Sequence, residues 1–303
     1  KGTFYDFFLL ELPRGMKDFD MDEMIKIEYV RQIFLETSKA FRFNLIEPSP
    51  IELLSVLEAK SGPSIRDEIY QFKDKGDREV ALRFDFTVGL TRYAAAQKNL
   101  KLPAKFSSFG GVWRYDEPQK GRYRFFHQWN IETFGNLNTE HDAELIEFTS
   151  RFFDNIGLQN VVIDINHRLV VEEYIKSVFS TPELKEEGYT YTTDDKFGSG
   201  KLDFMQDVFR AVDKIQKKSK QEILQEYKQK GYPLEKLEKI LEFSSLKGTP
   251  EEIQQNFDPT ILSSASSHGS GLEGWNELCS LYDTLKERGV DNIRINFGIV
   301  RGL

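Results

Sequence analysis

The amino-acid sequence predicts an α+β fold, in which an antiparallel β-sheet is flanked by helices and a helical domain is inserted late in the chain. Strand patterns occur in neighbouring pairs, within residues 68–86 and 106–134, and helical patterns lie between these pairs. Within residues 168–262 the strand patterns nearly vanish. No GxGxxG or Walker-type glycine loop is present, so nucleotide binding by a Rossmann or P-loop fold is not supported.

The composition along the chain predicts three segments. Residues 1–167 carry the strand pairs and form the main α+β domain, whereas residues 168–270 form a helical insertion rich in Lys, Glu, Gln and Leu. A Ser/Gly-rich stretch at residues 263–271 is typical of a linker. Residues 271–303 then return to the α+β domain.

Periodicity and turn residues predict the individual elements. In chain order these are a helix at 20–41, a strand at 43–46, two strands within 68–86, a helix at 87–97, long strands at 106–115 and 123–134, a helix at 139–156, a strand at 161–165, a helix at 272–288 and a strand at 292–299. Pro48 and Pro50 forbid a helix after the first strand, because proline lacks a backbone donor. Lys75-Gly76-Asp77 is a turn between strands.

Cap residues predict where several helices begin and end. Thr139 to Asp142 resembles an N-terminal capping box, and Gly157 closes the same helix. Thr181-Pro182 and Thr249-Pro250 each fit a capping threonine followed by proline at the first helical position.

Composition also restricts the class of protein. Of 303 residues, 39% are hydrophobic, which is enough for a core of useful size. Cys279 is the single cysteine, which excludes an intramolecular disulfide framework and, with only four histidines, leaves little material for a zinc cluster. We therefore expect no metal site made by the chain alone, and a location in the reducing cytoplasm.

Two further classes are disfavoured by the bulk sequence. No stretch approaches the roughly 18 apolar residues of a transmembrane helix, so no membrane contact is expected. The net charge of −8 argues against a simple electrostatic nucleic-acid binder. An RNA enzyme stays possible, because phosphate binding needs only a local basic surface.

One strand of the predicted sheet carries an unusual row of side chains. Because alternate residues of a strand share a face, the same face carries Phe126, Gln128, Asn130, Glu132 and Phe134. Burying amides and a carboxylate without partners costs roughly 1–3 kcal/mol each, so a solvated outer face is the plain explanation. The opposite face, which includes His127, is largely core material.

The loop next to this row favours a functional explanation. Arg114 and Asp116 share a face of the preceding strand, and Lys120, Arg122 and Arg124 follow them. Guanidinium groups beside amides and a carboxylate could bind a phosphate on one side and an ammonium or imidazole on the other.

Residues 113–132, from Trp113-Arg114-Tyr115 to Asn130-Ile131-Glu132, closely resemble motif 2 of class II aminoacyl-tRNA synthetases, in the form seen in the histidyl-tRNA synthetase family. Residues 12–19 resemble the start of that family, and residues 20–52 resemble motif 1, the dimer-forming element. Residues 82–87 resemble its LR-x-[ED]-x-T segment, and residues 297–303 the first histidine-specific motif. The resemblance implies a class II synthetase-like antiparallel sheet with an inserted helical domain.

The resemblance also implies a role for particular residues. The predicted catalytic residues are Arg114 and Arg301, both at the α-phosphate. The predicted ATP-binding residues are Arg114, Asp116, Arg122 at the terminal phosphates and Phe126 on adenine. The predicted histidine-binding residues are Glu132 at the imidazole, and Asp85, Thr87 and Gln128 at the α-ammonium.

The implied activity is histidine–tRNA ligation. L-histidine is activated with ATP, with Mg²⁺ arriving on the ATP phosphates, and is then transferred from histidyl-adenylate to tRNA(His). A homodimer is the implied assembly. The alternative is a non-catalytic relative that acts as the regulatory subunit of ATP phosphoribosyltransferase, and a third interpretation is a pure RNA-binding module. Retention of Arg114, Arg122 and Arg301 together favours the enzyme.

Several residues have a plain structural explanation beside the functional one. Asp85 stands where many relatives have Glu, and it could simply cap the helix that begins near Thr87. Arg83 is as well explained by a structural ion pair. A lysine-rich stretch could bind a tRNA acceptor stem or form a solvated helix face; it consists of Lys214, Lys217, Lys218 and Lys220. Members of the family continue past the position of Leu303 into motif 3 and an anticodon-binding domain, so we expect that the recorded sequence stops early.

Overall fold

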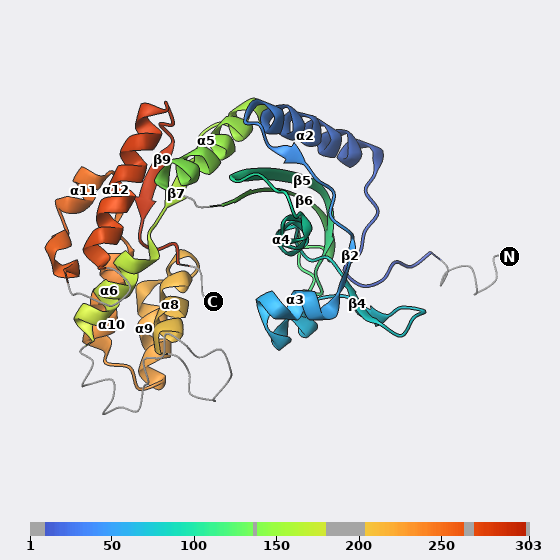
Figure 1. The fold of residues 1–303 in the computed structure, drawn as a ribbon. Coiled ribbons are helices and arrows are strands. Elements are labelled where there is room, and N and C mark those ends of the chain that lie inside the picture. Colours follow the sequence, from blue (N-terminus) through green and yellow to red (C-terminus); the bar gives the residue numbers. More distant parts are fainter. Residues whose placement is uncertain (1–9, 136–137, 180–203, 264–269, 301–303) are drawn as a thin grey trace. The chain divides into compact units, whose positions relative to one another are not determined.

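The computed structural model of the chain describes residues 10–135, 138–179, 204–263 and 270–300. Contacts divide the chain into two compact units, residues 1–141 with 151–158 and residues 142–150 with 159–303. Helices and small sheets alternate in the manner of the predicted α+β class (Figure 1). Within the described residues, no helix is long and apolar enough to cross a lipid bilayer.

The first unit contains two three-stranded sheets and their helices. Its elements are α2 (Met21–Ala40), β1 (Asn44–Leu45), β2 (Ile51–Leu53), α3 (Leu54–Ser61), the 3-10 helix η1 (Pro63–Asp67), β3 (Gln71–Lys73), β4 (Glu79–Leu82), α4 (Thr87–Ala96), β5 (Ala104–Trp113), β6 (Phe125–Phe134) and the two ends of α5 (Thr139–Ile156). The strands that the sequence predicts around the turn at residues 75–77 are β3 and β4. β2 and α3 follow Pro50 directly, and the sequence pattern did not indicate either of them.

The central sheet has the strand order β1-β5-β6. β5 and β6 are antiparallel over ten residue pairs, which include Gly110 with Gln128 and Phe106 with Glu132. β1 joins β5 in parallel over two pairs. The predicted pair of long strands is therefore confirmed, and their register fixes which side chains of β6 share a face.

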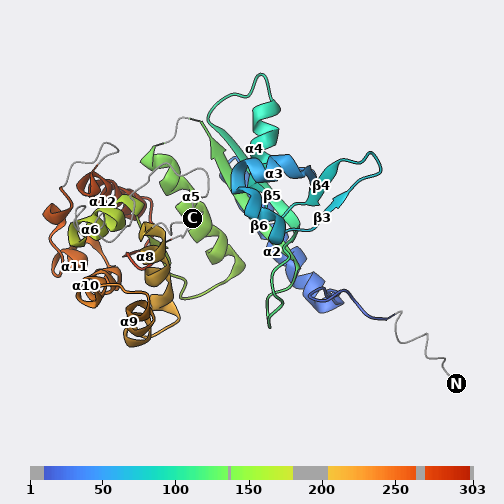
Figure 2. The ribbon, with the colours of Figure 1, turned by 90° about the horizontal axis from the view of Figure 1, so that it is seen from below.

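The two faces of this sheet are covered by different helices. On one face Trp129 packs against Phe34 of α2, with ring centroids 5.9 Å apart, and against Phe152 at 5.2 Å. The other face lies against α4, and Figure 1 shows α2 and α4 on opposite sides of β5 and β6. In the view from below, α3 lies next to α4 (Figure 2). α4 thus brings its first residues to the face that carries the polar row of β6.

The second sheet of this unit has the strand order β2-β4-β3 and is antiparallel throughout. It packs on α3 through a small apolar cluster that includes Leu54, Leu57 and Ala81. A hairpin of two strands alone is only marginally stable in water, and burial of these apolar side chains against α3 stabilises it.

The second unit contains the sheet β7-β9-β8 and most of the remaining helices. Its elements are β7 (Ile163–Ile165), α6 (Arg168–Val178), α8 (Phe204–Asp213), the 3-10 helix η2 (Lys214–Gln216), α9 (Lys220–Gln229), α10 (Leu234–Ser244), β8 (Lys247–Gly248), α11 (Pro250–Gln254), the 3-10 helix η3 (Pro259–Leu262), α12 (Gly271–Glu287) and β9 (Ile293–Asn296). Phe243 stacks on Phe297 in its core, with ring centroids 4.6 Å apart. The predicted cap at Thr249 is confirmed, whereas Thr181-Pro182 lies outside the described residues.

β9 pairs in parallel with β7 and antiparallel with β8. β7 lies in the first predicted segment and β9 in the third, so strands from both sides of the helical stretch share a sheet. β8 is a short strand within the stretch that was expected to be helical. The division into residues 1–167, 168–270 and 271–303 stays a prediction.

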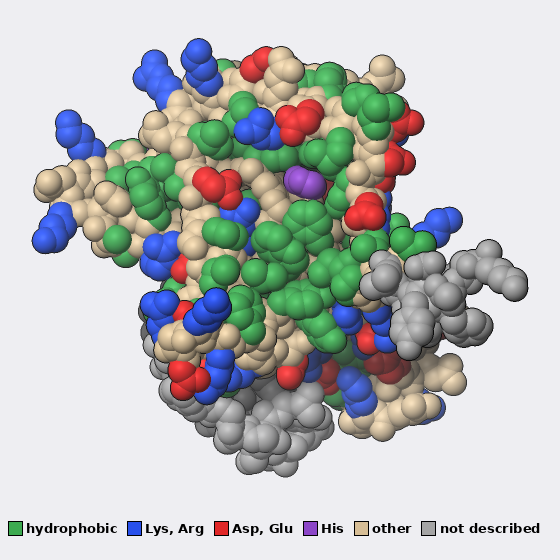
Figure 3. Space-filling view, turned by 90° about the vertical axis from the view of Figure 1, so that its right-hand side faces the viewer, with side chains coloured by type: hydrophobic (Ala, Val, Ile, Leu, Met, Phe, Trp, Pro, Cys, Tyr) green, Lys and Arg blue, Asp and Glu red, His purple; other side chains and the backbone are tan. Residues whose placement is uncertain are grey.

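The first unit exposes large apolar side chains at its surface. Four of them follow one another along α2; they are Met21, Met24, Ile25 and Tyr29. Three more lie on β2 and β3; they are Ile51, Leu53 and Phe72. Figure 3 shows apolar side chains gathered across one side of the molecule, with charged groups around them.

Candidate functional site

The polar row of β6 meets the first turn of α4. The hydroxyl of Thr87, the first residue of α4, donates a hydrogen bond to Oε1 of Glu132 at 2.6 Å. Asn130 donates from Nδ2 to the same oxygen at 2.9 Å and approaches the Thr87 hydroxyl at 3.5 Å. These half-buried side chains form one network, which brings together two predicted histidine-binding residues, Thr87 and Glu132.

Arg114 lies at the other end of the same face of β6. Its Nη2 donates to Oε1 of Gln128 at 3.1 Å, and its Nε donates to the carbonyl oxygen of Phe84 at 3.0 Å. The guanidinium carbon lies 5.1 Å from the centre of the Phe126 ring. The structure therefore brings Arg114, Gln128 and Phe126 together, on the face that also carries Glu132.

Asp85 lies in the turn that enters α4. Its Oδ1 accepts a long hydrogen bond, 3.4 Å, from the amide of Val88 in the first turn of α4, whose N-cap residue is Phe86. Asp85 therefore lies one residue before the N-cap position and is not the cap residue, and this bond occupies one of its carboxylate oxygens. No contact between Asp85 and Glu132 is present among the described residues.

Asp116 and Arg122 lie in the connection between β5 and β6. The connection folds back on itself, because Arg122 and Gln119 form an isolated antiparallel bridge with N–H···O distances of 2.9 and 3.3 Å. The Arg122 side chain is exposed and makes no hydrogen bond or ion pair with the described residues. The structure therefore leaves Arg122 available for an anion, at the end of a fixed turn.

Arg124 is a residue of this site that the sequence did not single out for a role. It is 7% exposed, and its side chain donates to the carbonyl oxygens of Asp116 at 3.0 Å and Arg14 at 3.2 Å. Its guanidinium also lies 3.8 Å from the centre of the Tyr115 ring. Arg124 thus joins the N-terminal segment to the connection that carries Arg122, and the sequence signal for it was only an arginine in a basic run.

Arg83 and His127 have structural surroundings. Arg83 is 6% exposed, donates to Glu47 at 2.5 Å and to the carbonyl oxygen of Gly111 at 2.8 Å, and is therefore a buried structural ion-pair partner. His127 lies on the face away from Glu132, with its ring 5.4 Å from that of Phe19. Burial among these aromatic rings lowers the pKa of His127, and the charge of Glu28 opposes this shift only in part.

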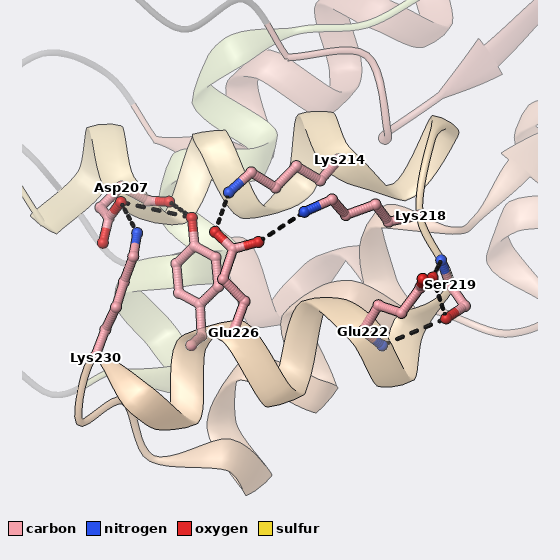
Figure 4. Close-up of polar contacts among 8 residues, drawn as sticks. Asp207, Lys214, Lys218, Ser219, Glu222, Glu226 and Lys230 are labelled. Atoms are coloured by element: carbon pink, nitrogen blue, oxygen red, sulfur yellow. Dashed lines mark hydrogen bonds and ion pairs between the residues drawn. The ribbon is translucent and has the colours of Figure 1, made fainter.

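The lysine-rich stretch of the second unit is engaged in ion pairs. Lys214 and Lys218 both contact the carboxylate of Glu226, the second at 3.0 Å (Figure 4). Hydrogen bonds from these two lysines lower the pKa of Glu226 to about 2. Lys220 contacts Glu238 and Glu242, each at 2.7 Å. Such pairing reduces the positive charge offered to a polyanion, which favours the solvated helix face over a tRNA-binding surface.

Two predictions concern Arg301 and metal ions. Arg301 lies outside the described residues. Within the described part of the chain, no three His, Cys, Asp or Glu side chains gather closely enough to hold a metal ion. The carboxylates of Asp85, Asp116 and Glu132 lie on three different segments, which are the turn before α4, the β5–β6 connection and β6 itself.

Comparison with known proteins identifies the family of the chain. A family model described as histidyl-tRNA synthetase matches residues 15–198. The chain is 28% identical to the histidine–tRNA ligase of Pyrobaculum islandicum over 98% of its own length, and 30% identical to that of Pyrobaculum neutrophilum over 96%. It spans 63% and 62% of the lengths of these two relatives.

Solved structures agree with the fold. A histidyl-tRNA synthetase from Nostoc sp. PCC 7120 superposes with a TM-score of 0.74 at 22% identity, covering 97% of this chain and 62% of that one. A Bacillus halodurans protein described as an ATP phosphoribosyltransferase regulatory subunit/histidyl-tRNA synthetase gives 0.73 at 17% identity, covering 96% and 69%. The family model described above matches residues 15–198, which is more than half of the chain. This match shows that the chain belongs to the histidyl-tRNA synthetase family.

Proposed function

We propose that the chain is the catalytic part of a histidine–tRNA ligase, which activates L-histidine with ATP to histidyl-adenylate and transfers it to tRNA(His). The observation that carries this proposal is the shared face of β6, where Arg114 contacts Gln128 and Thr87 contacts Glu132. A carboxylate that can accept from a ring N–H lies on the same face as a guanidinium that can bind phosphate.

The amino acid would lie along this face. Glu132 would accept a hydrogen bond from the imidazole through Oε2, because Oε1 already accepts from Thr87 and Asn130. Gln128, with Thr87 and Asp85, would bind the α-ammonium. Each of these groups has an oxygen that can accept from an N–H group, as the ammonium requires.

The nucleotide would lie against Arg114, Arg122 and Phe126, with Asp116 near adenine. When the histidine carboxylate attacks the α-phosphorus, pyrophosphate leaves and negative charge develops on the phosphoryl oxygens. Arg114 is held by Phe84 and Gln128 before the substrate arrives, so it would stabilise that charge with little reorganisation. Arg301 would be the second guanidinium at the α-phosphate.

Mg²⁺ would bind with the ATP phosphates and neutralise part of their charge. The arrangement of single carboxylates fits an ion that is held mainly by the nucleotide and water. The chain's own residues would then orient the phosphates through arginine rather than through a preformed metal cage.

ATP–pyrophosphate exchange tests this function. With the whole protein, we expect exchange that depends on L-histidine and is absent with other amino acids. Replacing Arg114 with Ala is expected to abolish exchange while leaving the unfolding temperature near that of the wild type. Absence of exchange in a folded wild-type protein would contradict the proposal.

The regulatory subunit of ATP phosphoribosyltransferase is the second candidate, and the Bacillus halodurans structure carries that description beside histidyl-tRNA synthetase. Such a protein needs to bind histidine but has no need of Arg114 and Arg122 for ATP. Histidine binding without pyrophosphate exchange would favour this candidate. Binding of tRNA without any dependence on histidine or ATP would favour an RNA-binding module.

We further propose a homodimer in the cytoplasm. The exposed apolar side chains of α2, among them Ile25 at 62% and Tyr29 at 51% exposure, would be covered by a second copy of the unit. Replacing Ile25 with Asp is expected to shift the mass measured by light scattering from the dimer to the monomer. An unchanged mass would place the interface elsewhere.

A further inference from the structure

The hydrogen bonds around Glu132 are distributed unevenly over its two oxygens. Oε1 accepts from the Thr87 hydroxyl at 2.6 Å and from Asn130 Nδ2 at 2.9 Å. No described residue donates a hydrogen bond to Oε2. One oxygen is therefore occupied by the protein, and the other is left for a ligand.

Asn130 lies between the two ends of the site. It occupies β6 two residues after Gln128 and two before Glu132, so all three side chains share a face. Its amide nitrogen has two hydrogens, and both acceptors within 3.5 Å, the Glu132 carboxylate and the Thr87 hydroxyl, belong to the predicted histidine subsite.

We propose that Asn130 is a positioning residue that determines the orientation of Glu132, and hence the recognition of the imidazole ring, a role that rests on the function proposed above. A carboxylate held by a single hydroxyl can turn about its last side-chain torsion, which has a broad energy well. The second donor fixes the plane of the carboxylate. Oε2 then presents its lone pairs to one place on the face of β6, where a ring N–H donor is bound.

Asn130 also fixes the direction of the Thr87 hydroxyl. A hydroxyl group can donate one hydrogen bond, and in this network the Thr87 hydroxyl donates it to Glu132. The Asn130 amide, at 3.5 Å, favours that arrangement because it places a donor beside the Thr87 oxygen. The remaining lone pair of Thr87 is then an acceptor, as an α-ammonium group requires.

Two substitutions separate donation from packing. Asn130→Ala removes the donor and leaves space, whereas Asn130→Asp keeps the shape and replaces the donor with a like charge beside Glu132. If Asn130 acts by donating, both variants lose roughly ten- to a hundredfold in histidine affinity at pH 8, which is the usual effect of one hydrogen bond to a charged group. Asp is expected to be the worse of the two, because two adjacent carboxylates repel.

The pH dependence gives a signature that a packing role lacks. When the pH is lowered from about 8 to about 6, the carboxyl group introduced by Asn130→Asp is expected to take up a proton, because a like charge beside it disfavours its ionised form. A protonated carboxyl group is a donor again. The ratio of wild-type to Asp-variant affinity is therefore expected to fall several-fold, whereas the ratio for Asn130→Ala stays constant.

The experiment is calorimetric titration of the whole protein with L-histidine, with histidinol, and separately with ATP. Histidinol keeps the ring and the ammonium, so its affinity is expected to fall in parallel with that of histidine, while the affinity for ATP stays within about twofold. Asn155→Asp is the matched control, since Asn155 also donates to a threonine, Thr37, at 3.4 Å in the same unit but away from this face. This control is expected to bind histidine as the wild type does.

The outcomes distinguish the positioning role from the proposed function. Wild-type protein that binds no histidine would overturn both. Wild-type binding with unchanged affinity in the Ala and Asp variants would overturn only the role of Asn130. Equal losses for histidine and ATP, or an Asp variant that binds better than the Ala variant at pH 8, would also overturn it.

Discussion

The backbone amide of Arg124 donates a hydrogen bond to the carbonyl oxygen of Gly15 at 2.8 Å, and the two residues pack so closely that Gly15 has no room for a β-carbon. An added Cβ would lie 2.8 Å from Cδ of Arg124 and 2.9 Å from Cγ of Pro118. Gly15 also has a φ of +83°, which side chains disfavour. The N-terminal segment is therefore fitted to the connection that presents Arg122.

Replacing Gly15 with Ala is expected to loosen this connection. The strained φ and the contact with Arg124 together should cost about 2–4 kcal/mol of stability, measured by urea unfolding. Affinity for ATP should fall more than affinity for histidine, because the connection carries Arg122, which is predicted to bind the terminal phosphates of ATP. The control is Gly62→Ala, where φ is +75° and no atom lies within 4 Å of the added Cβ. Equal losses of stability in the two variants would show that crowding at Arg124 is unimportant.

His127 is expected to make the stability of the first unit depend on pH. Its folded-state pKa is lowered by burial, so the folded state binds fewer protons than the unfolded state near neutral pH. The stability that uncharged His127 contributes to the folded state is therefore complete above the ordinary histidine pKa of about 6.5, and it is lost as the pH falls through and below that value. Unfolding free energies measured between about pH 5 and 8 should show a smaller slope for His127→Phe than for the wild type. Parallel curves would mean that His127 has no part in the dependence.

Arg301→Ala is expected to separate binding from chemistry. If Arg301 contacts the α-phosphate most strongly in the transition state, the rate of activation should fall by roughly a hundredfold or more with little change in histidine affinity. Stopped-flow measurement of pyrophosphate release, together with a histidine titration, would show the two effects separately. A loss of histidine affinity as large as the loss of rate would indicate a ground-state role.

The exposed ion pairs of the lysine-rich stretch are expected to contribute little to tRNA binding. Because Lys218 is paired with Glu226, replacing it with Ala should change the affinity for tRNA by less than about threefold at physiological salt. Filter binding at several salt concentrations would measure both the affinity and its salt dependence. A tenfold loss with a shallower salt dependence would restore the tRNA-binding interpretation.

The sequence predicted the central sheet well because its signals are local. The alternation of side chains along residues 123–134 correctly predicts that Gln128 and Glu132 share a face, and the pairing of β5 with β6 needs only a connection that can turn. α3 was missed for a physical reason. It begins at Leu54 without a side-chain cap, directly after a strand, so neither a cap nor a polar boundary marks its start.

Contacts between residues far apart in sequence were the part that local patterns could not supply. The Thr87–Glu132 bond joins residues that are 45 positions apart, and the Arg124–Arg14 bond joins residues that are 110 apart. A pattern of residue types names possible donors and acceptors but not which of them meet. For this reason Asn130 was recognised as part of a polar row and its bond to Glu132 was not.

Substitution of Glu132 tests the central claim most directly, because that claim is recognition of the imidazole by a carboxylate on β6. In Glu132→Gln the amide oxygen can still accept from Thr87 and Asn130, which leaves an NH₂ group where the ring needs an acceptor. Titration of this variant should show a loss of about tenfold or more in histidine affinity and an unchanged ATP affinity. Histidine binding that matches the wild type, or an equal loss for ATP, would contradict the account.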